Sequence, residues 1–175
     1  MRRISIVQGE HAVVAEPRTV LTTVLGSCIA VCLRDPVARV GGMNHFLLAE
    51  PSSRCALSPA DMQRYGVHAM EILINALMNR GAERERLQAH LYGGANVLAG
   101  LAEIGTRNAQ FARDFLRTEG ILTTHVDVGG RVARRVEFMP HEGRSRCSRV
   151  SHAPALDPQQ GAPLTAAPSG ELELF

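Results

Sequence analysis

Two strand-like runs joined by an Asp-Pro turn constrain the fold of this chain more than any other feature. The runs are SCIAVCL at 27–33 and VGGMNHFLL at 40–48, and residues 34–39 between them contain Asp35-Pro36. Proline presets φ at the second position of a turn, and an aspartate before it can accept hydrogen bonds from the turn's own backbone. The two runs are therefore expected to form a β-hairpin.

This hairpin would bring a cysteine and a histidine together. With the turn centred on residues 36–37, Cys28 lies opposite His45, and directly opposed side chains have Cβ atoms about 5 Å apart. A thiol beside an imidazole is the minimum arrangement for an activated cysteine nucleophile. A bulge at Gly41-Gly42 would shift the register by one residue and make the contact diagonal.

A buried structural cysteine is the alternative for each thiol, because cysteine often behaves as a small hydrophobic residue. Cys28 departs from that pattern, since it follows Leu25-Gly26-Ser27, a small-residue turn at a strand entrance where a side chain can be exposed. Cys32 lies inside the apolar run and is expected to be structural. The two cannot form a disulfide, because residues four apart on a strand are separated by about 13 Å.

Composition indicates one soluble globular domain in a reducing compartment. The chain has 175 residues, of which 45% are hydrophobic and 21% charged. It contains neither an apolar run of the roughly 20 residues needed to cross a bilayer nor an N-terminal signal core, so we expect a cytoplasmic protein without membrane insertion. Four cysteines without CxxC pairs give no zinc signature and no disulfide framework. The net charge of +2 is too small to indicate nucleic-acid binding.

Periodicity predicts strands interleaved with two helices, an α+β or layered α/β domain. Apolar residues between Val67 and Met78 recur at helical spacing, with Gly81 as the stop, and a second helix is expected over about 108–117. Strands are expected within 4–16 and 19–25, in the hairpin, and over 87–92, 121–128 and 132–139. Residues 50–59 read as a loop that contains Cys55.

The C-terminal residues 151–175 differ in composition from the rest of the chain. Four prolines are interspersed with Ala, Gly, Gln and Ser, and no apolar periodicity remains. Such a segment buries little, so we expect a domain over 1–150 and a disordered or loosely attached tail over 151–175.

Three further groups of residues are weaker candidates for a site. Gly93-Gly94-Ala95-Asn96 lacks the Lys-Ser/Thr ending of a phosphate loop and is expected to be a turn that could line a cleft. Cys147, His141 and His152 match no common metal spacing, and six arginines between 131 and 149 disfavour a cation there. Those arginines are expected to form a solvated face, or to meet an acidic partner.

Several motifs are spread along the chain: TTVLGSCIAVCL at 22–33, GGMNHF at 41–46, GGA at 93–95, IGTRN at 104–108 and the Gly-Gly at 129–130. Together they resemble the CheD family, the chemoreceptor glutamine deamidases of bacterial chemotaxis. The likeness extends over about residues 4–150 in the family's order. It implies a layered α/β/β/α sandwich with mixed sheets, similar to the catalytic domain of the cytotoxic necrotizing factors.

The resemblance also implies the site residues. Cys28 corresponds to the nucleophile, His45 to the general base, and Thr22 to the third site residue, with adjacent Thr23 as the alternative. Gly26, Ser27 and Asn44 would lie near the substrate and the oxyanion. No metal or organic cofactor is expected.

The function implied is a protein-glutamine glutaminase, a hydrolase that converts specific glutamines of methyl-accepting chemotaxis receptors to glutamate through a Cys-His thioester mechanism. The expected partners are those receptors and, as in some family members, a CheC-type phosphatase, with the chain itself a monomer. The alternative is a non-catalytic regulator that binds the phosphatase or the receptors.

Overall fold

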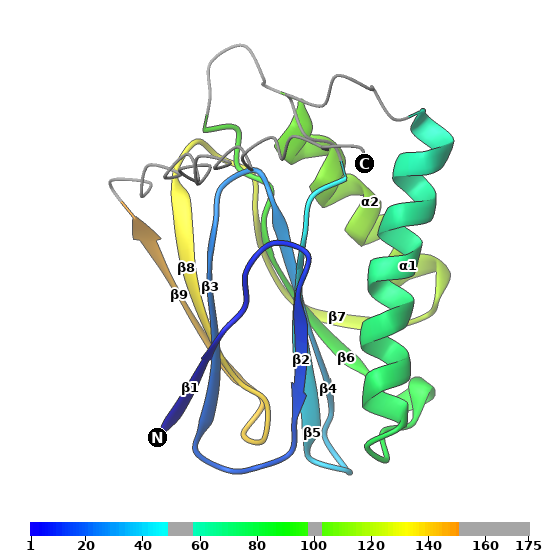
Figure 1. The fold of residues 1–175 in the computed structure, drawn as a ribbon, viewed down its shortest axis with the longest axis vertical. Helices are drawn as coiled ribbons and strands as arrows, with labels where there is room; N and C mark the ends of the chain where they lie inside the picture. Colours follow the sequence, from blue (N-terminus) through cyan, green and yellow to red (C-terminus); the bar gives the residue numbers. More distant parts are fainter. Residues whose placement is uncertain (49–57, 98–102, 151–175) are drawn as a thin grey trace, which may run out of the picture.

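The computed structural model describes residues 1–48, 58–97 and 103–150 (Figure 1). Its elements, in chain order, are β1 (Arg2–Ser5), β2 (His11–Val14), β3 (Thr19–Leu25), β4 (Ile29–Asp35), β5 (Val40–Phe46), α1 (Pro59–Met78), the short 3-10 helix η1 (Arg84–Arg86), β6 (Gln88–Gly93), α2 (Ile104–Thr118), β7 (Leu122–Val128), β8 (Ala133–Met139) and β9 (Arg144–Val150). Cys55 and the predicted tail lie outside the described residues.

The strands form two mixed sheets that pack face to face. One sheet has the order β1-β3-β8-β9 and the other β2-β5-β4-β6-β7, and each contains one parallel pair. The expected α+β sandwich with mixed sheets is confirmed. Within the described residues, both helices lie on the five-stranded sheet, so the layers there are β/β/α (Figure 1).

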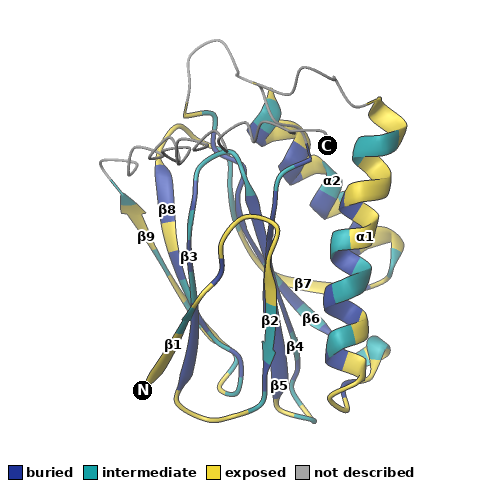
Figure 2. Ribbon diagram, viewed as in Figure 1, coloured by how far each residue is buried: buried dark blue, intermediate teal, exposed yellow. Residues whose placement is uncertain are grey.

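Two cores result from this layering. One lies between the helices and the five-stranded sheet, and the other fills the space between the sheets. The five-stranded sheet is covered on both faces, so every residue of β5 is buried (Figure 2). This explains why β4 and β5 read as nearly continuous apolar runs, as strands buried on both faces do.

Helix α1 follows the predicted pattern and packs closely on β5. The Ser58 hydroxyl caps its N-terminus by accepting from the Asp61 backbone N–H at 3.2 Å. Its buried face includes Met70 and Leu73. A side chain at Gly42 would approach Leu73 to within 2.9 Å, so glycine is what permits this packing distance. Within the described residues, no helix is long and apolar enough to cross a membrane.

The hairpin exists, but its predicted register is wrong. The turn occupies residues 36–39, Asp35 pairs with Val40, and His45 pairs with Ala30 rather than with Cys28. The pairing runs without a bulge through Gly41-Gly42. Because the shift is two residues, the side chains keep their predicted faces.

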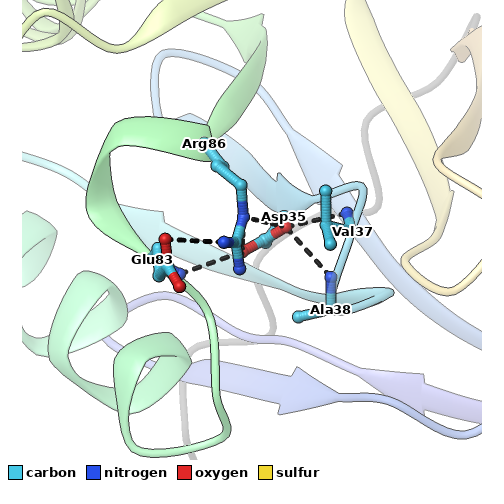
Figure 3. Close-up of polar contacts among 5 residues, drawn as sticks. All are labelled: Asp35, Val37, Ala38, Glu83 and Arg86. Atoms are coloured by element: carbon cyan, nitrogen blue, oxygen red, sulfur yellow. Dashed lines mark hydrogen bonds and ion pairs between the residues drawn. The ribbon is translucent and has the colours of Figure 1, made fainter.

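The buried carboxylate of Asp35 fixes where this turn begins (Figure 3). It accepts from the backbone N–H groups of Val37 at 2.8 Å, Ala38 at 3.1 Å and Glu83 at 2.9 Å, and from Arg86 Nη2 at 2.7 Å. Burial alone would raise the pKa of Asp35. The hydrogen bonds from Arg86 and the three N–H groups lower it by more than burial raises it, so this pKa lies well below its usual range. The turn is thereby joined to η1.

Strand β9 is an element that the sequence analysis does not predict. Four of its seven residues are exposed and polar or charged, and the strand lies at a sheet edge. The pattern resembles a solvated face because an edge strand has only one buried side.

Candidate active site

Cys28 and His45 both face the space between the two sheets. Cys28 lies at the entrance of β4 and is half-buried against the inter-sheet core, whereas His45 in β5 is only 6% exposed. Since His45 pairs with Ala30, Cys28 is its diagonal neighbour, a relation that spans about 7–8 Å. The structure thus brings the predicted pair to one site without direct opposition.

A hydroxyl on the opposite sheet fixes the orientation of the His45 ring. Thr23 Oγ1 lies 2.9 Å from His45 Nδ1 and donates to the Ile6 carbonyl at 2.7 Å. The hydroxyl has one proton and gives it to a carbonyl that can only accept, so its oxygen accepts from Nδ1–H. The remaining nitrogen, Nε2, carries the lone pair; it is buried and has no hydrogen-bond partner among the described residues.

Burial also sets the charge of this imidazole. Desolvation lowers the pKa of His45, while the Ile6 carbonyl and the charge of Glu10 raise it to a smaller extent. The ring is therefore neutral at pH 7 and Nε2 is available as a base.

Thr23, and not Thr22, is the threonine that contacts His45. Residues along a strand alternate between its faces, and Leu21, Thr23 and Leu25 face the inter-sheet core. Thr22 is half-buried on the other face of β3, between Ser5 and Glu137. Of the two threonines considered for the third site residue, Thr23 is therefore the one that contacts His45, and Thr22 is not.

Asn44 lies on the wrong face of β5 for a role at this site. Its Oδ1 accepts from the Val31 N–H at 3.1 Å and its Nδ2 donates to the Ala69 carbonyl of α1 at 3.2 Å. Asn44 therefore joins β4, β5 and α1, and it supports the fold rather than the substrate or the oxyanion.

The turn of Gly26, Ser27 and Cys28 is held through all three of its carbonyl groups. Gly26 O accepts from Ala95 N–H at 2.9 Å, and Cys28 O accepts from Gly94 N–H at 2.7 Å. Ser27 O accepts from Asn108 Nδ2 at 2.9 Å. In a trans peptide the C=O and the following N–H point in opposite directions, so these bonds also fix the N–H groups of the turn.

Gly93 explains why a glycine segment follows β6. Its φ is +108°, and a side chain there would collide with the Cys28 carbonyl oxygen. The predicted turn at 93–96 therefore supports the turn formed by residues 26–28.

Asn108 and Arg134 are supporting residues that the sequence reasoning missed. Asn108 is 1% exposed and joins the turn of residues 26–28 to Leu48. Its Oδ1 accepts a hydrogen bond from the Leu48 N–H at 3.1 Å. Arg134, also 1% exposed, donates to Gly129 O at 2.6 Å and to Asp127 at 3.0 Å beside the glycine segment. Asn108 lies on the same face of α2 as Phe111 and Phe115. A polar residue on such a helix face is a signal that could have identified Asn108 from the sequence.

The other thiols of the described residues are poorly suited to nucleophilic chemistry. Cys32 is fully buried, which raises its pKa. Burial and the neighbouring Asp127 raise the pKa of Cys147 to about 11. His141 bonds the Ala15 carbonyl at 2.9 Å, and His152 is outside the described residues. Among the described residues, no three His, Cys, Asp or Glu side chains are grouped to hold a metal.

A cavity of about 710 Å³ lies between α1 and α2. Phe111, Phe115 and Met62 are among its lining residues, but neither Cys28 nor His45 is. The described residues that line it include no cysteine or histidine, so the inter-sheet site remains the candidate for Cys-His chemistry.

Two solved structures show a limited likeness to this fold. A crystal structure of the Neisseria meningitidis protein NMB0706 (DUF152) covers 75% of this chain, at 10% identity and a TM-score of 0.49. The Bacillus licheniformis protein YfiH covers 67%, at 13% identity and a TM-score of 0.43.

Sequence relatives are much closer. A protein of Zymomonas mobilis subsp. mobilis named "Probable chemoreceptor glutamine deamidase CheD" is 54% identical over 86% of this chain and 82% of its own length. A Caulobacter vibrioides protein of the same name is 49% identical over 99% of this chain and 93% of its own length. The family described as CheD chemotactic sensory transduction matches residues 47–149. With a site of this geometry and relatives of this identity over nearly its whole length, the chain belongs to the CheD family.

Proposed function

We propose that this chain is a cytoplasmic hydrolase that deamidates glutamine side chains of methyl-accepting chemotaxis receptors, with Cys28 as the nucleophile and His45 as the general base. The relatives named as chemoreceptor glutamine deamidases support the reaction and its substrate class. The observation that carries the proposal is the His45 ring, whose Nδ1 bonds Thr23, and whose Nε2 is buried between the sheets, in the same inter-sheet core against which Cys28 packs.

The reaction divides into two acyl-transfer steps. His45 Nε2 takes the thiol proton of Cys28, and the sulfur attacks Cδ of the substrate glutamine. The tetrahedral intermediate collapses to a thioester as the imidazolium gives its proton to the departing ammonia. A water, deprotonated by the same nitrogen, then attacks the thioester; the C–S bond breaks, and glutamate and the Cys28 thiol are released.

The nucleophile turn suits stabilisation of the oxyanion. Ala95 and Asn108 bond the carbonyls of Gly26 and Ser27, so the N–H groups that follow, those of Ser27 and Cys28, point away from these two partners. A preorganised donor of this kind contributes about 3 kcal/mol to the transition state. No step needs a metal or an organic cofactor.

The decisive experiment is peptide mass spectrometry on receptors co-expressed with the chain. We expect Gln-to-Glu conversion at specific receptor positions with the wild type and none with Cys28→Ala. The alternative, a non-catalytic regulator of the receptors or of a CheC-type phosphatase, predicts that Cys28→Ala supports chemotaxis as well as the wild type. That result, or equal conversion in both strains, would exclude the proposed mechanism.

Thr23→Val should lower kcat/KM by about 10- to 100-fold, because the imidazole loses the bond that fixes its tautomer and ring orientation. Thr22→Val is the matched control: it makes the same change one residue earlier, on the other face of β3, and should leave kcat/KM within about 2-fold, because Thr22 does not contact His45. Both are measured as ammonia release from a receptor fragment. A larger loss in Thr22→Val would restore Thr22 as the third site residue.

A further inference from the structure

A glutamine of this chain already contacts the nucleophile. The loop between β1 and β2, residues 6–10, crosses from one sheet to the other beside the site, and Gln8 lies in its turn. The Cys28 thiol donates to the side-chain oxygen Oε1 of Gln8 at 3.4 Å. The group at the nucleophile is thus a primary carboxamide, the functional group on which the proposed enzyme acts.

The position of this loop is fixed by His45 itself. Gly9 N–H donates to the His45 carbonyl at 2.8 Å, and His45 N–H donates to the Glu10 carbonyl at 3.0 Å. Within the loop, the Glu10 carboxylate accepts from the Val7 N–H at 3.0 Å, and the Glu10 N–H donates to the Val7 carbonyl at 3.0 Å. The backbone that carries Gln8 is therefore built onto the strand that carries the general base.

The thiol contact with Gln8 has a consequence for the catalytic pair. In this arrangement the Cys28 proton is directed to an amide oxygen, while His45 Nε2 is buried and has no hydrogen-bond partner in the part of the chain that the structure describes. A general base must come within hydrogen-bond reach of the proton that it removes, about 2.6–3.2 Å between heavy atoms. The two catalytic groups are thus not engaged with each other while Gln8 holds the thiol.

We propose that Gln8 occupies, in the resting enzyme, the subsite that receives the side-chain carboxamide of the substrate glutamine. This inference rests on the proposed function. An incoming substrate amide displaces the Gln8 side chain, and the thiol then turns to His45 Nε2. The Gln8 residue is exposed, so displacement needs rotation about its side-chain bonds and no opening of the core.

The Gln8 side chain should compete with the substrate carboxamide for the same subsite. Removing the competing amide with Gln8→Ala should lower KM for a receptor fragment by about 2- to 10-fold, the range expected for loss of one neutral hydrogen bond. The value of kcat should stay the same, because Gln8 is absent from the substrate-bound site. Gln8→Met, of similar length but without an amide, should behave like Gln8→Ala.

A second measurement reports the reactivity of the Cys28 thiol and does not depend on turnover of a substrate. Alkylation of the full chain by iodoacetamide at pH 7, followed by peptide mapping, should be about 2- to 10-fold faster at Cys28 in Gln8→Ala than in the wild type. Cys32 and Cys147 serve as internal references. Gln110→Ala is the matched control, since Gln110 is another exposed glutamine with a side-chain hydrogen bond, to Asp114 at 3.0 Å; it should change neither rate nor KM.

The outcomes separate the two proposals. Faster alkylation of Cys28 in Gln8→Ala with no deamidation by any variant would support the position of Gln8 and reject the proposed function. Unchanged or slower alkylation, or a raised KM in both Gln8 variants, would overturn the inference. Conversion of Gln8 itself to glutamate in the wild type but not in Cys28→Ala would also overturn it, because Gln8 would then be a substrate rather than a resting occupant.

Discussion

Cys28→Ala should reduce receptor deamidation to background, a loss of about 10⁴-fold or more, and His45→Ala should come close to it. Each variant removes one member of a unit, either the atom that bonds the substrate or the base that activates it. Effects within such a unit are not additive, so the double variant should be little worse than either single one. The measurement is single-turnover conversion of a receptor fragment followed by mass spectrometry.

Cys147→Ala is the control for the loss of a thiol. Cys147 is half-buried and burial raises its pKa to about 11, so its removal should leave deamidation unchanged. Circular dichroism should show that all variants are folded. Activity of Cys28→Ala above one-hundredth of the wild type would require a different nucleophile.

The pH profile should follow the His45 imidazole. Burial lowers its pKa below the ordinary 6.5, so the basic form persists to lower pH than in a solvent-exposed histidine. The value of kcat/KM should therefore be at its maximum at neutral pH and should fall only as the pH drops through the lowered pKa of His45. An acidic limb centred above pH 6.5 would contradict this assignment of the base.

Asp35→Ala should lower the free energy of unfolding by about 2–4 kcal/mol, because it leaves three backbone N–H groups and the Arg86 guanidinium without their acceptor. Arg86 retains its ion pair with Glu83 and is partly exposed, which keeps the loss below that of a fully buried pair. Urea unfolding measures the change. Asp114→Asn breaks an exposed ion pair with Arg117 and should cost at most about 0.5 kcal/mol.

Acid should reproduce the effect of this substitution. The pKa of Asp35 is lower in the folded than in the unfolded chain, where it is about 3.9. The folded chain therefore binds this proton less readily, and the stabilisation is complete above the unfolded pKa and lost as pH falls below it. The wild type and Asp35→Ala should converge in stability below about pH 4. Parallel curves down to pH 2 would mean that the carboxylate is not responsible.

The sequence by itself determined the local elements and the chemistry-bearing residues. The apolar spacing of Val67 to Met78 placed α1, the Asp35-Pro36 turn placed the hairpin, and the LGSC and GGMNHF motifs identified Cys28 and His45. The helix and the turn follow from periodicity and turn preference, which depend on residues close together in the sequence. The two motifs indicated Cys28 and His45 through their likeness to a known family.

The tertiary structure decided which residues meet. The hairpin register differs by two residues from the predicted one because Asp35 bonds Glu83 and Arg86, which lie about fifty residues away in sequence. Thr23 contacts His45 and Thr22 does not, because β3 presents its Thr23 face to the other sheet. The sequence of β3 alone does not indicate which of its two faces lies against that sheet.

The same reason applies to the surroundings of the nucleophile. Gln8 contacts Cys28 from a loop that ties one sheet to the other, and Asn108 reaches Ser27 from a helix eighty-one residues further along the chain. Such contacts are set by how the layers pack, and hydrogen bonds between distant segments leave little trace in local sequence. The sequence therefore indicated the proposed nucleophile and base, Cys28 and His45. Only the packing of the two sheets determined the hydrogen bond between Thr23 and His45 and the contact of the Gln8 amide with Cys28.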